Sequence, residues 1–446
     1  MLRSTLQKNE ETSNLPNAGQ FLLRQTTRYL NPFLVRLDEK IDRRLVHTFR
    51  SLFIAILLHR NTKLGLIISE LGKFICGIHH APAGTKRISN LLRSKKWTHE
   101  DIADYTLDQV EQYYQDLRRR GKRILLLWDD SVVEKAESWR SGGLCPVASS
   151  KGKRLTRIRP GFYNKHKRIS VPGFHWSAAV MTTYGEKCQT ALMRWWTTRG
   201  KHKDSSDNIF YGMLRDLSER FGNLVVHVFD RGYANLPTLE RLWKFDQFFI
   251  VRWKTNQLLR MENGLVKKTH LVIRSYKSKD YRTVWDKERK KTRRVGIAYA
   301  PVWHPQHLDK QLFIVIVRDK KKHQSPMYLL TNLQLDSVGM AWQVFFEYIH
   351  RWSIEQAFRF MKTELAIESI RLWFFQNRLK LFAIVSLVYD FIICLARRWK
   401  GWALMVVRNY CPRTGKRQRK TNSVPLYRFR SAISEILKIG FYQSSG

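Results

Sequence analysis

From residue 21 to about residue 117, apolar residues recur at three- and four-residue spacing, which is the pattern of amphipathic helices. No strand pattern interrupts this region. The clearest predicted helices lie at residues 45–58, 63–75, 85–93 and 107–117. A turn at Pro82 and Gly84 is expected before the third of them. Residues 1–120 are therefore predicted to form an all-helical N-terminal domain.

The pattern changes at Gly121, after which short continuous apolar runs alternate with helical segments. The first run, residues 123–128, predicts a buried strand that ends on Asp129 and Asp130. The elements expected after it are strands at 175–183 and 188–195 in a hairpin, a helix at 207–221, a strand at 224–229 ending on Asp230, a helix at 236–244 and a strand at 247–253. This order predicts a mixed sheet with helices packed on it, an α/β domain with the element order of ribonuclease-H-like folds.

After residue 253 the alternation stops, and strand-like runs between charged turns predict a β-rich insertion that extends to residue 333. Helical spacing returns at residue 337 and continues to about residue 365. The most apolar stretch, residues 379–396, contains Asp390 and is barely long enough to cross a bilayer, so it is predicted to be a buried helix.

Two further features bear on location and chemistry. Residues 1–20 are polar and lack the apolar core of a signal peptide, which favours a cytoplasmic protein with no membrane partner. The five cysteines contain no CxxC pair, so the sequence predicts neither a disulfide framework nor a zinc ribbon.

The charge balance indicates the partner. The chain of 446 residues has 80 Lys and Arg against 37 Asp and Glu, a net charge of +43, which favours nucleic acid. Three basic segments stand out, two of them with aromatic residues between the cations, as contacts to a nucleic-acid backbone require. These segments are residues 151–168 with Lys165, Lys167 and Arg168, residues 277–294 with Trp285, Lys290 and Arg293, and residues 413–420. The basic helix at 85–93 either contacts DNA or is the solvated face of a bundle.

Two aspartates occupy similar places in the predicted sheet. Asp129 and Asp230 each follow a buried apolar run at the point where a strand is expected to end. Two divalent metal ions can run phosphodiester chemistry by activating the attacking oxygen and stabilising the leaving one. Such ions prefer carboxylates that converge from rigid elements. Both aspartates are therefore candidate metal ligands, with Asp130 as an alternative to Asp129.

A third acid is expected on a helix laid against the same sheet. Tyr348, Arg351, Glu355 and Lys362 fall within an arc of roughly 60° at about 100° per residue, so they share one helix face. On such a face the glutamate would bind metal while Arg and Lys hold phosphate oxygens. The alternative is a solvated stripe of charge pairs, which is common on helices.

These segments resemble those of one enzyme family. The segment from Tyr348 to Lys362 resembles the Y-(2)-R-(3)-E-(6)-K signature of the insertion-sequence-four family of bacterial DDE transposases, and all four positions match. The stretch Phe229-Asp230-Arg231-Gly232-Tyr233 is similar to the family's second-aspartate segment, and Trp128-Asp129-Asp130-Ser131 to its first, Asp-x-Ser. Ser131 therefore favours Asp129 over Asp130. The resemblance covers residues 123–362.

The resemblance implies a function and a set of partners. Such an enzyme binds the terminal inverted repeats of an insertion sequence in double-stranded DNA and cleaves the ends with Mg²⁺, for which Mn²⁺ can substitute. It then joins the 3′-hydroxyls to target DNA, in relatives through a hairpin. Catalysis and metal binding would fall to Asp129, Asp230 and Glu355. Contacts with DNA would come from Tyr348, Arg351, Lys362 and Arg231, and from a tryptophan that stacks on a flipped base, for which Trp253, Trp285 and Trp303 are candidates.

The resemblance also implies a homodimer on DNA in the bacterial cytoplasm, associated with the nucleoid. Two alternatives remain open: a non-catalytic DNA-binding protein derived from a transposase, and a metal-dependent DNA nuclease. The expected domains are a helical DNA-binding domain (1–120), a ribonuclease-H-like catalytic domain in two parts (121–252 and 334–400), the β-rich insertion (253–333) and a basic C-terminal tail (401–446).

Overall fold

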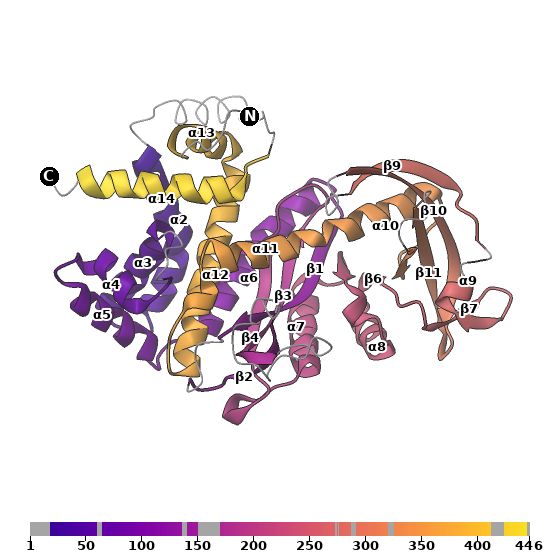
Figure 1. Cartoon of the computed structure of the whole chain (residues 1–446), viewed down its shortest axis with the longest axis horizontal. Helices are drawn as coiled ribbons and strands as arrows, with labels where there is room; N and C mark the ends of the chain where they lie inside the picture. The colour runs from indigo at the N-terminus through magenta and orange to yellow at the C-terminus, as the bar shows by residue number, and fades with distance from the viewer. Residues whose placement is uncertain are drawn as a thin grey trace, which may run out of the picture.

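The computed structural model describes residues 18–59, 65–135, 141–149, 170–272, 274, 276–286, 291–319, 325–411 and 423–443. Helices gather at one end of the molecule, a twisted sheet crosses its middle, and further strands lie at the other end (Figure 1). The described residues therefore confirm the predicted mixed α/β architecture.

The N-terminal region is helical, as predicted. Its helices are α2 (Ala18–Asp38), α3 (Arg43–Leu58), α4 (Ile68–Cys76), α5 (Ala81–Arg93) and α6 (His99–Arg119). At the start of α3, the Asp42 side chain accepts a hydrogen bond from the amide of Arg44. At the start of α6, Thr98 and Asp101 form a capping box. The helix predicted from residue 63 begins at Ile68, and residues 60–64 lie outside the described part.

Helices α4 and α5 pack through two glycines. A Cβ added at Gly84 would lie 2.1 Å from the Gly72 carbonyl oxygen, so only glycine permits this approach. The turn predicted at Pro82 and Gly84 is wrong, because both residues lie inside α5. Pro82 occupies its first turn, where no amide donor is needed, and the contact with Gly72 outweighs the poor helix propensity of Gly84.

The variant Gly84→Ala is expected to lower the free energy of unfolding by about 2 kcal/mol, because the added methyl group overlaps the Gly72 backbone. Gly401→Ala is the matched control, since nothing lies within 4 Å of its Cβ position. That control should gain about 0.5 kcal/mol from reduced backbone freedom. Urea denaturation measures both, and a Gly84→Ala variant as stable as Gly401→Ala would contradict the close packing.

The described strands form one sheet in the order β2-β3-β1-β5-β6-β12-β11-β10-β7-β8, with β4 on β3 and β9 on β10. They are β1 (Ile124–Glu134), β2 (Cys145–Ala148), β3 (Ser170–Thr182), β4 (Gln189–Trp196), β5 (Val225–Phe229), β6 (Phe248–Arg252), β7 (Leu258–Met261), β8 (Val266–Lys268), β9 (Asp280–Asp286), β10 (Lys291–His304), β11 (His307–Asp319) and β12 (Met327–Thr331).

The central strands follow the predicted order. Strands β4, β3 and β1 are antiparallel, whereas β1, β5 and β6 are parallel. The two parallel crossovers contain α7 (Ser206–Phe221) and α8 (Leu236–Lys244), as expected of parallel strands. The predicted β3–β4 hairpin is confirmed, and its turn contains Gly185 at φ 86°.

The β-rich residues after 253 continue this sheet. Strand β12 pairs with β6, and β11 and β10 follow it outward. The short helix α9 (Thr269–Val272) lies among these strands, at the end of the molecule far from the N-terminal helices (Figure 1). The insertion is thus joined to the central strands by backbone hydrogen bonds as well as by the chain.

Side chains from the two faces of β1 enter two separate cores. Ile124, Leu126 and Trp128 pack with residues of α6, α7 and α8. Leu125 and Leu127 point the other way and belong to the core that includes α10, α11 and α12. Because side chains alternate along a strand, neighbouring residues of β1 meet different helices.

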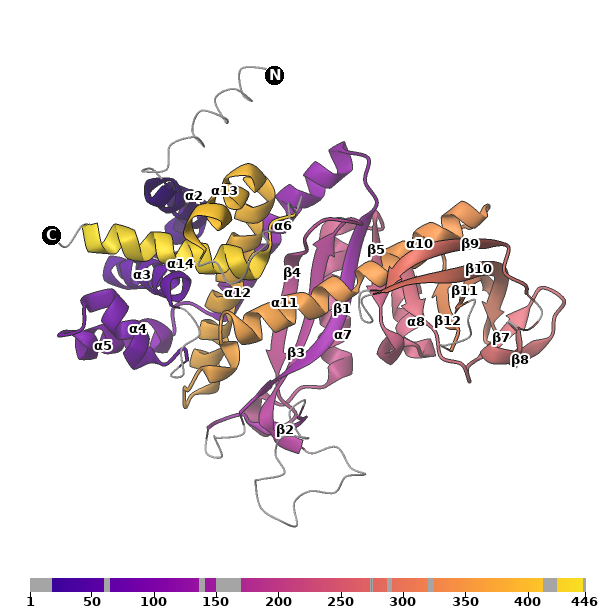
Figure 2. The same ribbon diagram turned by 45° about the horizontal axis from the view of Figure 1, so that its top comes forward.

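Residues 337–365 form two helices instead of the single predicted one. They are α10 (Val338–His350) and α11 (Trp352–Thr363), which follow one another across the sheet (Figure 2). The amide of Arg351 donates to the Tyr348 carbonyl at 2.9 Å and that of Ile354 to the Arg351 carbonyl at 3.0 Å. These hydrogen bonds run to the carbonyl three residues earlier, as in a 3₁₀ helix, so they tighten the backbone at Arg351 and interrupt the α-helical pattern. A short 3₁₀ turn, Ile367–Ser369, follows.

Helix α12 (Phe375–Arg398) is the apolar helix predicted from the sequence. By length and composition it could cross a membrane, yet its most apolar window is completely buried inside the protein. Its Asp390 is fully buried and accepts a hydrogen bond from the amide of Thr190 at 2.9 Å. Burial raises the pKa of Asp390 to about 7, so this core helix carries a buried acid that titrates near neutral pH.

Asp390 should make stability depend on pH. Its native pKa of about 7 exceeds the unfolded value of 3.8, so between these values the native state holds more protons and stability falls as pH rises. From pH 5.5 to 7.5 the loss should be about 2 kcal/mol. Asp390→Asn keeps the acceptor for Thr190 and should lack this loss. Urea denaturation of both proteins at each pH tests this, and identical pH slopes would contradict it.

The residues expected as a basic tail include two packed helices, α13 (Lys400–Tyr410) and α14 (Leu426–Gln443). In α14, Phe429, Ile433 and Ile436 are buried. The buried Arg430 donates to the carbonyl of Ile56 at 2.7 Å, at the end of α3. Residues 429–437 of α14 therefore contribute to the helical core. The basic segment at 413–420 lies outside the described residues.

Candidate active site

The sequence predicted that the first strand ends on Asp129 and Asp130. This prediction is wrong, because β1 continues to Glu134. Asp129 and Asp130 lie in its middle, where burial is interrupted between two buried ends. Being neighbours on a strand, they point to opposite faces of the sheet. The Asp129 carboxylate lies 3.3 Å from Nη1 of Arg351, on the face that α11 covers.

Asp130 faces the other side of the sheet. It accepts a hydrogen bond from the Tyr233 hydroxyl at 3.0 Å. Its cross-strand neighbour is Ser177, whose hydrogen bond lowers the pKa of Asp130, while burial, the largest effect, raises it. The structure therefore gives the two adjacent acids different partners, which spacing alone could not do.

Asp230 lies next to Asp129 on the neighbouring strand. The parallel register pairs Leu127 with Val228, and Asp129 and Asp230 each come two residues later. Asp230 therefore stands at the level of Asp129, about 5 Å away in the sheet. Its carboxylate accepts the amide of Gly232 at 2.7 Å, and a Cβ at Gly232 would lie 2.9 Å from that same oxygen. Glycine thus allows the turn that holds Asp230.

A chain of buried side-chain hydrogen bonds connects β1, β5 and the start of β6. The indole of Trp128 donates to Nδ1 of His227 at 2.9 Å, and Nε2 of His227 lies 3.0 Å from the side-chain oxygen of Gln247. Burial lowers the pKa of His227 to about 4, so the ring is neutral at physiological pH. The chain links β1 with β5 and the start of β6, and it fixes the two strands that present Asp129 and Asp230.

Arg351 connects the sheet with the signature helix. Its guanidinium contacts the carboxylate of Asp129 at 3.3 Å and that of Glu355 at 2.5 Å. The side chain is only 12% exposed. Tyr348 is buried beside it, and this burial raises the phenol pKa, while the charge of Arg351 and a hydrogen bond with it act in the opposite direction. The break at Arg351 thus places its side chain between two acids.

The electrostatics show that the acids repel one another. Burial raises the pKa of Asp129 to about 7; Arg351 acts against this rise, and the charges of Asp230 and Glu355 add to it. Burial alone would lower the pKa of Arg351, but Asp129, Tyr348 and Glu355 raise it above its usual value. A permanent cation therefore sits between Asp129 and Glu355, and Asp230 is near enough for its charge to act on Asp129.

Lys362 shares the helix face but not this cluster. It lies seven residues beyond Glu355, about 10 Å along the helix axis. Its ammonium pairs with Glu368 at 3.4 Å, in the 3₁₀ turn after α11. Of the four signature residues, the structure brings Tyr348, Arg351 and Glu355 together and leaves Lys362 at the edge.

The donor set suits a hard divalent cation, because it consists of carboxylates on three separate elements. Among the described residues, however, no three His, Cys, Asp or Glu side chains are close enough to hold one ion as they stand. The guanidinium of Arg351 supplies the positive charge between Asp129 and Glu355. For the acids to share a metal ion, Arg351 has to give up at least one of these contacts.

The remaining predicted DNA-binding residues are scattered. Arg231 is exposed in the turn after Asp230. Trp285 on β9 is 56% exposed, whereas Trp253 is buried and Trp303 half-buried. Arg293 is half-buried on β10, the strand that pairs with β9. The predicted residues Lys165, Lys167, Arg168 and Lys290 lie outside the described part of the chain.

Sequence analysis gave no role to two residues near these acids. Tyr233, which donates to Asp130, stands in the segment that carries Asp230. Arg252, at the end of β6, is close enough for its charge to lower the pKa of Tyr348. Its place at a predicted strand end beside Trp253 was the signal that could have revealed it.

A basic groove of about 780 Å³ lies on the other side of α11. From α11 it is lined by Ser353, Gln356, Ala357 and Phe360, which point roughly away from Glu355. Its cations are Arg120, Lys187, Arg397 and Lys400. Arg120 pairs with Glu186, and Arg397 lies over the Tyr113 ring at 3.5 Å from its centre. The spacing of charges along the chain gave no sign of this groove.

Comparisons with known proteins add little to this geometry. No protein-family model and no curated protein sequence matches the chain. Among solved structures, the chain is similar to a piggyBac transposase synaptic complex with hairpin DNA, determined by cryo-EM. The similarity covers 91% of this chain and 73% of that one, at 11% identity and a TM-score of 0.43. At these values the likeness carries no argument about fold or mechanism here.

Proposed function

We propose that this protein is a DDE transposase of the insertion-sequence-four type, which cleaves the ends of a mobile DNA element and joins them to target DNA. The observation that carries the proposal is that Asp129 on β1 and Glu355 on α11 both contact Arg351, while Asp230, at the end of β5, stands beside Asp129. The strand order β4-β3-β1-β5-β6, antiparallel and then parallel, supports assigning these strands to a ribonuclease-H-like domain.

In this proposal Asp129, Asp230 and Glu355 hold Mg²⁺, or Mn²⁺ in its place. The bound metal would activate the attacking oxygen and stabilise the leaving one. Arg351, freed from an acid, would hold phosphate oxygens with its planar guanidinium, and Tyr348 would keep it oriented. Lys362 would contact the backbone further along the same DNA strand.

The wider surface supports a double-stranded DNA partner. The net charge of +43 and the basic groove behind α11 provide counter-charges for phosphates on more than one side of the molecule. Trp285 is our candidate for stacking on a flipped base, because it is more exposed than Trp253 or Trp303. A homodimer on the DNA ends, in the bacterial cytoplasm with the nucleoid, completes the proposal.

One assay tests this function against its alternatives. The purified full-length chain is incubated with Mg²⁺ or Mn²⁺ and labelled DNA from beside its gene, carrying any inverted repeats found there, together with unlabelled target DNA. Cleavage at the repeats followed by joining supports a transposase. Cleavage without joining indicates a metal-dependent nuclease, and binding without cleavage indicates a non-catalytic DNA-binding protein. Cleavage that persists in EDTA would overturn the metal-dependent chemistry.

A further inference from the structure

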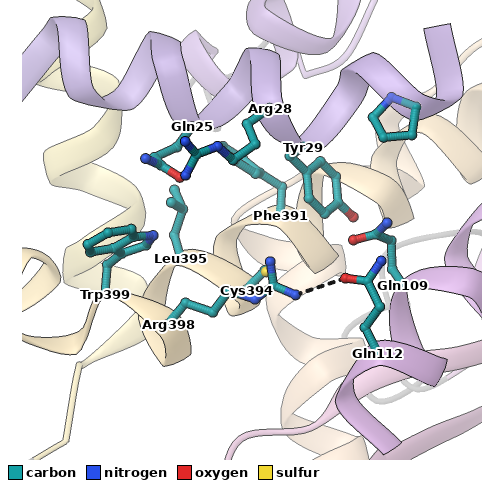
Figure 3. A pocket seen from close by; sticks show the side chains of 11 residues that line it. Gln25, Arg28, Tyr29, Gln109, Gln112, Phe391, Cys394, Leu395, Arg398 and Trp399 are labelled. Carbon is teal, nitrogen blue, oxygen red and sulfur yellow. Dashed lines mark hydrogen bonds between the residues drawn. The ribbon is translucent and has the colours of Figure 1, made fainter. Parts of the chain in front are cut away.

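A second cavity lies in the helical region, among α2, α6 and α12. Its volume is about 600 Å³, within the range of small-molecule sites, about 300–1,000 Å³. Figure 3 shows side chains from the three helices around it, among them Tyr29, Gln109 and Arg398. None of its lining residues belongs to the carboxylate cluster, so the cavity is a separate feature of the fold.

Two nearly buried polar groups line this cavity without partners. Tyr29 is 7% exposed, and its hydroxyl oxygen, shielded from solvent, has no hydrogen-bond partner among the described residues. Gln109 is 8% exposed, and the described part of the chain offers its side-chain amide no hydrogen bond either. Burying the Tyr29 hydroxyl unpaired costs free energy, roughly 1–3 kcal/mol. A ligand that completes its hydrogen bond would recover that cost.

The rim of the cavity is cationic. Arg28 and Arg398 are exposed, and neither forms an ion pair with a described acid. Arg398 donates a hydrogen bond to the side-chain oxygen of Gln112 at 3.2 Å, which orients its guanidinium at the rim (Figure 3). A guanidinium group can hold two phosphate oxygens at once. The rim therefore favours an anionic ligand.

The walls add aromatic and amide surface. Phe391 of α12 and Trp399, the residue after this helix, line the cavity, together with the side-chain amides of Gln25 and Gln112. Amide groups can pair with the edge of a nucleobase, as glutamine does with adenine, and aromatic rings stack on its faces. Pro32 on α2 also lines the cavity, and having no amide hydrogen it leaves the Arg28 carbonyl without its helical donor.

We propose that this cavity binds a nucleotide, with Arg28 and Arg398 holding the phosphate and Tyr29 and Gln109 bonding to the base. The ligand is either a free nucleotide or an unpaired nucleotide of bound DNA, which present the same groups. The inference goes beyond the proposed strand cleavage and does not depend on it, since a chain unable to cleave DNA would still bind the nucleotide.

Calorimetric titration of the full-length protein with each of the four deoxynucleoside monophosphates tests the proposal. At least one should bind, and its nucleoside without phosphate should bind about tenfold more weakly or worse. Tyr29→Phe should lower the affinity for that nucleotide by about three- to tenfold. The same variant should melt no lower than wild type without ligand, because it removes an unpaired buried hydroxyl.

Tyr114→Phe is the matched control. Its buried hydroxyl donates to the Phe221 carbonyl at 3.3 Å, and it does not line the cavity. This variant should lose stability and bind the nucleotide as wild type does. Equal effects of Tyr29→Phe and Tyr114→Phe on nucleotide affinity would overturn the proposal, since both would then act through the fold.

The source of the nucleotide is separated with two duplexes, one fully paired and one with a single unpaired nucleotide. If DNA supplies the ligand, Tyr29→Phe weakens binding of the second duplex by about three- to tenfold and leaves the first unchanged. If Tyr29→Phe weakens binding of the free nucleotide but of neither duplex, the ligand is a free nucleotide. If Tyr29→Phe changes the affinity for neither the nucleotide nor the duplexes, or if nucleoside and nucleotide bind equally well, the proposal is wrong.

Discussion

Asp129→Asn is expected to reduce metal-dependent cleavage of an element-end duplex by about 10³-fold or more, while binding of that duplex stays within a few-fold of wild type. A divalent ion supplies several kcal/mol of transition-state stabilisation, and each 1.4 kcal/mol lost is tenfold in rate. Asparagine keeps the shape of the side chain but not the charge that an ion needs. Single-turnover cleavage with saturating protein separates this loss of rate from a loss of binding.

Asp130→Asn is the matched control, because it makes the same change one residue away. The Asp130 carboxylate faces the opposite side of the sheet and pairs with Tyr233, so this variant should cleave within about tenfold of wild type. The reverse result, with Asp130→Asn inactive and Asp129→Asn active, would move the first acid to Asp130. Asp230→Asn and Glu355→Gln should behave like Asp129→Asn, and normal cleavage by either would remove it from the site.

Arg351→Gln should destabilise the metal-free protein by about 3 kcal/mol. Arg351 is the cation that contacts both Asp129 and Glu355, and removing one partner of a largely buried ion pair leaves uncompensated charge. If the three carboxylates can hold Mg²⁺, the ion should replace the lost charge. Millimolar Mg²⁺ should then stabilise Arg351→Gln by about 1–2 kcal/mol more than it stabilises wild type. Urea denaturation with EDTA or with Mg²⁺ measures both effects.

Arg123→Gln provides the comparison for this experiment. Arg123 pairs with the buried Glu347 at 3.3 Å, away from the three acids. Its loss should also destabilise the protein. Mg²⁺, however, should stabilise this variant no more than it stabilises wild type. A gain from Mg²⁺ that is the same in Arg351→Gln and Arg123→Gln would mean that the acid cluster is no metal site.

Local patterns predicted much of the chain because they depend on a few neighbouring residues. The three-to-four spacing placed the N-terminal helices, and short apolar runs placed β1 and β5, with Asp129 and Asp230 at or just beyond them. Of the four residues predicted to share one helix face, the structure brings Tyr348, Arg351 and Glu355 together and leaves Lys362 paired with Glu368. Each of these features follows from backbone geometry that repeats along a single segment.

The failures have a common physical origin in contacts between distant segments. Strand β1 continues past its acids because β3 pairs with it as far as Glu134. Gly84 lies in a helix because Gly72 is close against it. The apolar spacing of α14 became evident only once α3 stood beside it, where Arg430 bonds to the Ile56 carbonyl. Neither the groove behind α11 nor the cavity at Tyr29 is formed by one segment alone.

The sequence by itself therefore determined the order of helices and strands, the strong positive charge and a short set of candidate acids. The tertiary structure alone decided which face of the sheet each acid occupies, and so separated Asp129, beside Arg351, from Asp130, beside Tyr233. The reason is that hydrophobic periodicity records only that a position is buried. Which helix buries it, and which charge stands opposite, depends on how the segments pack together.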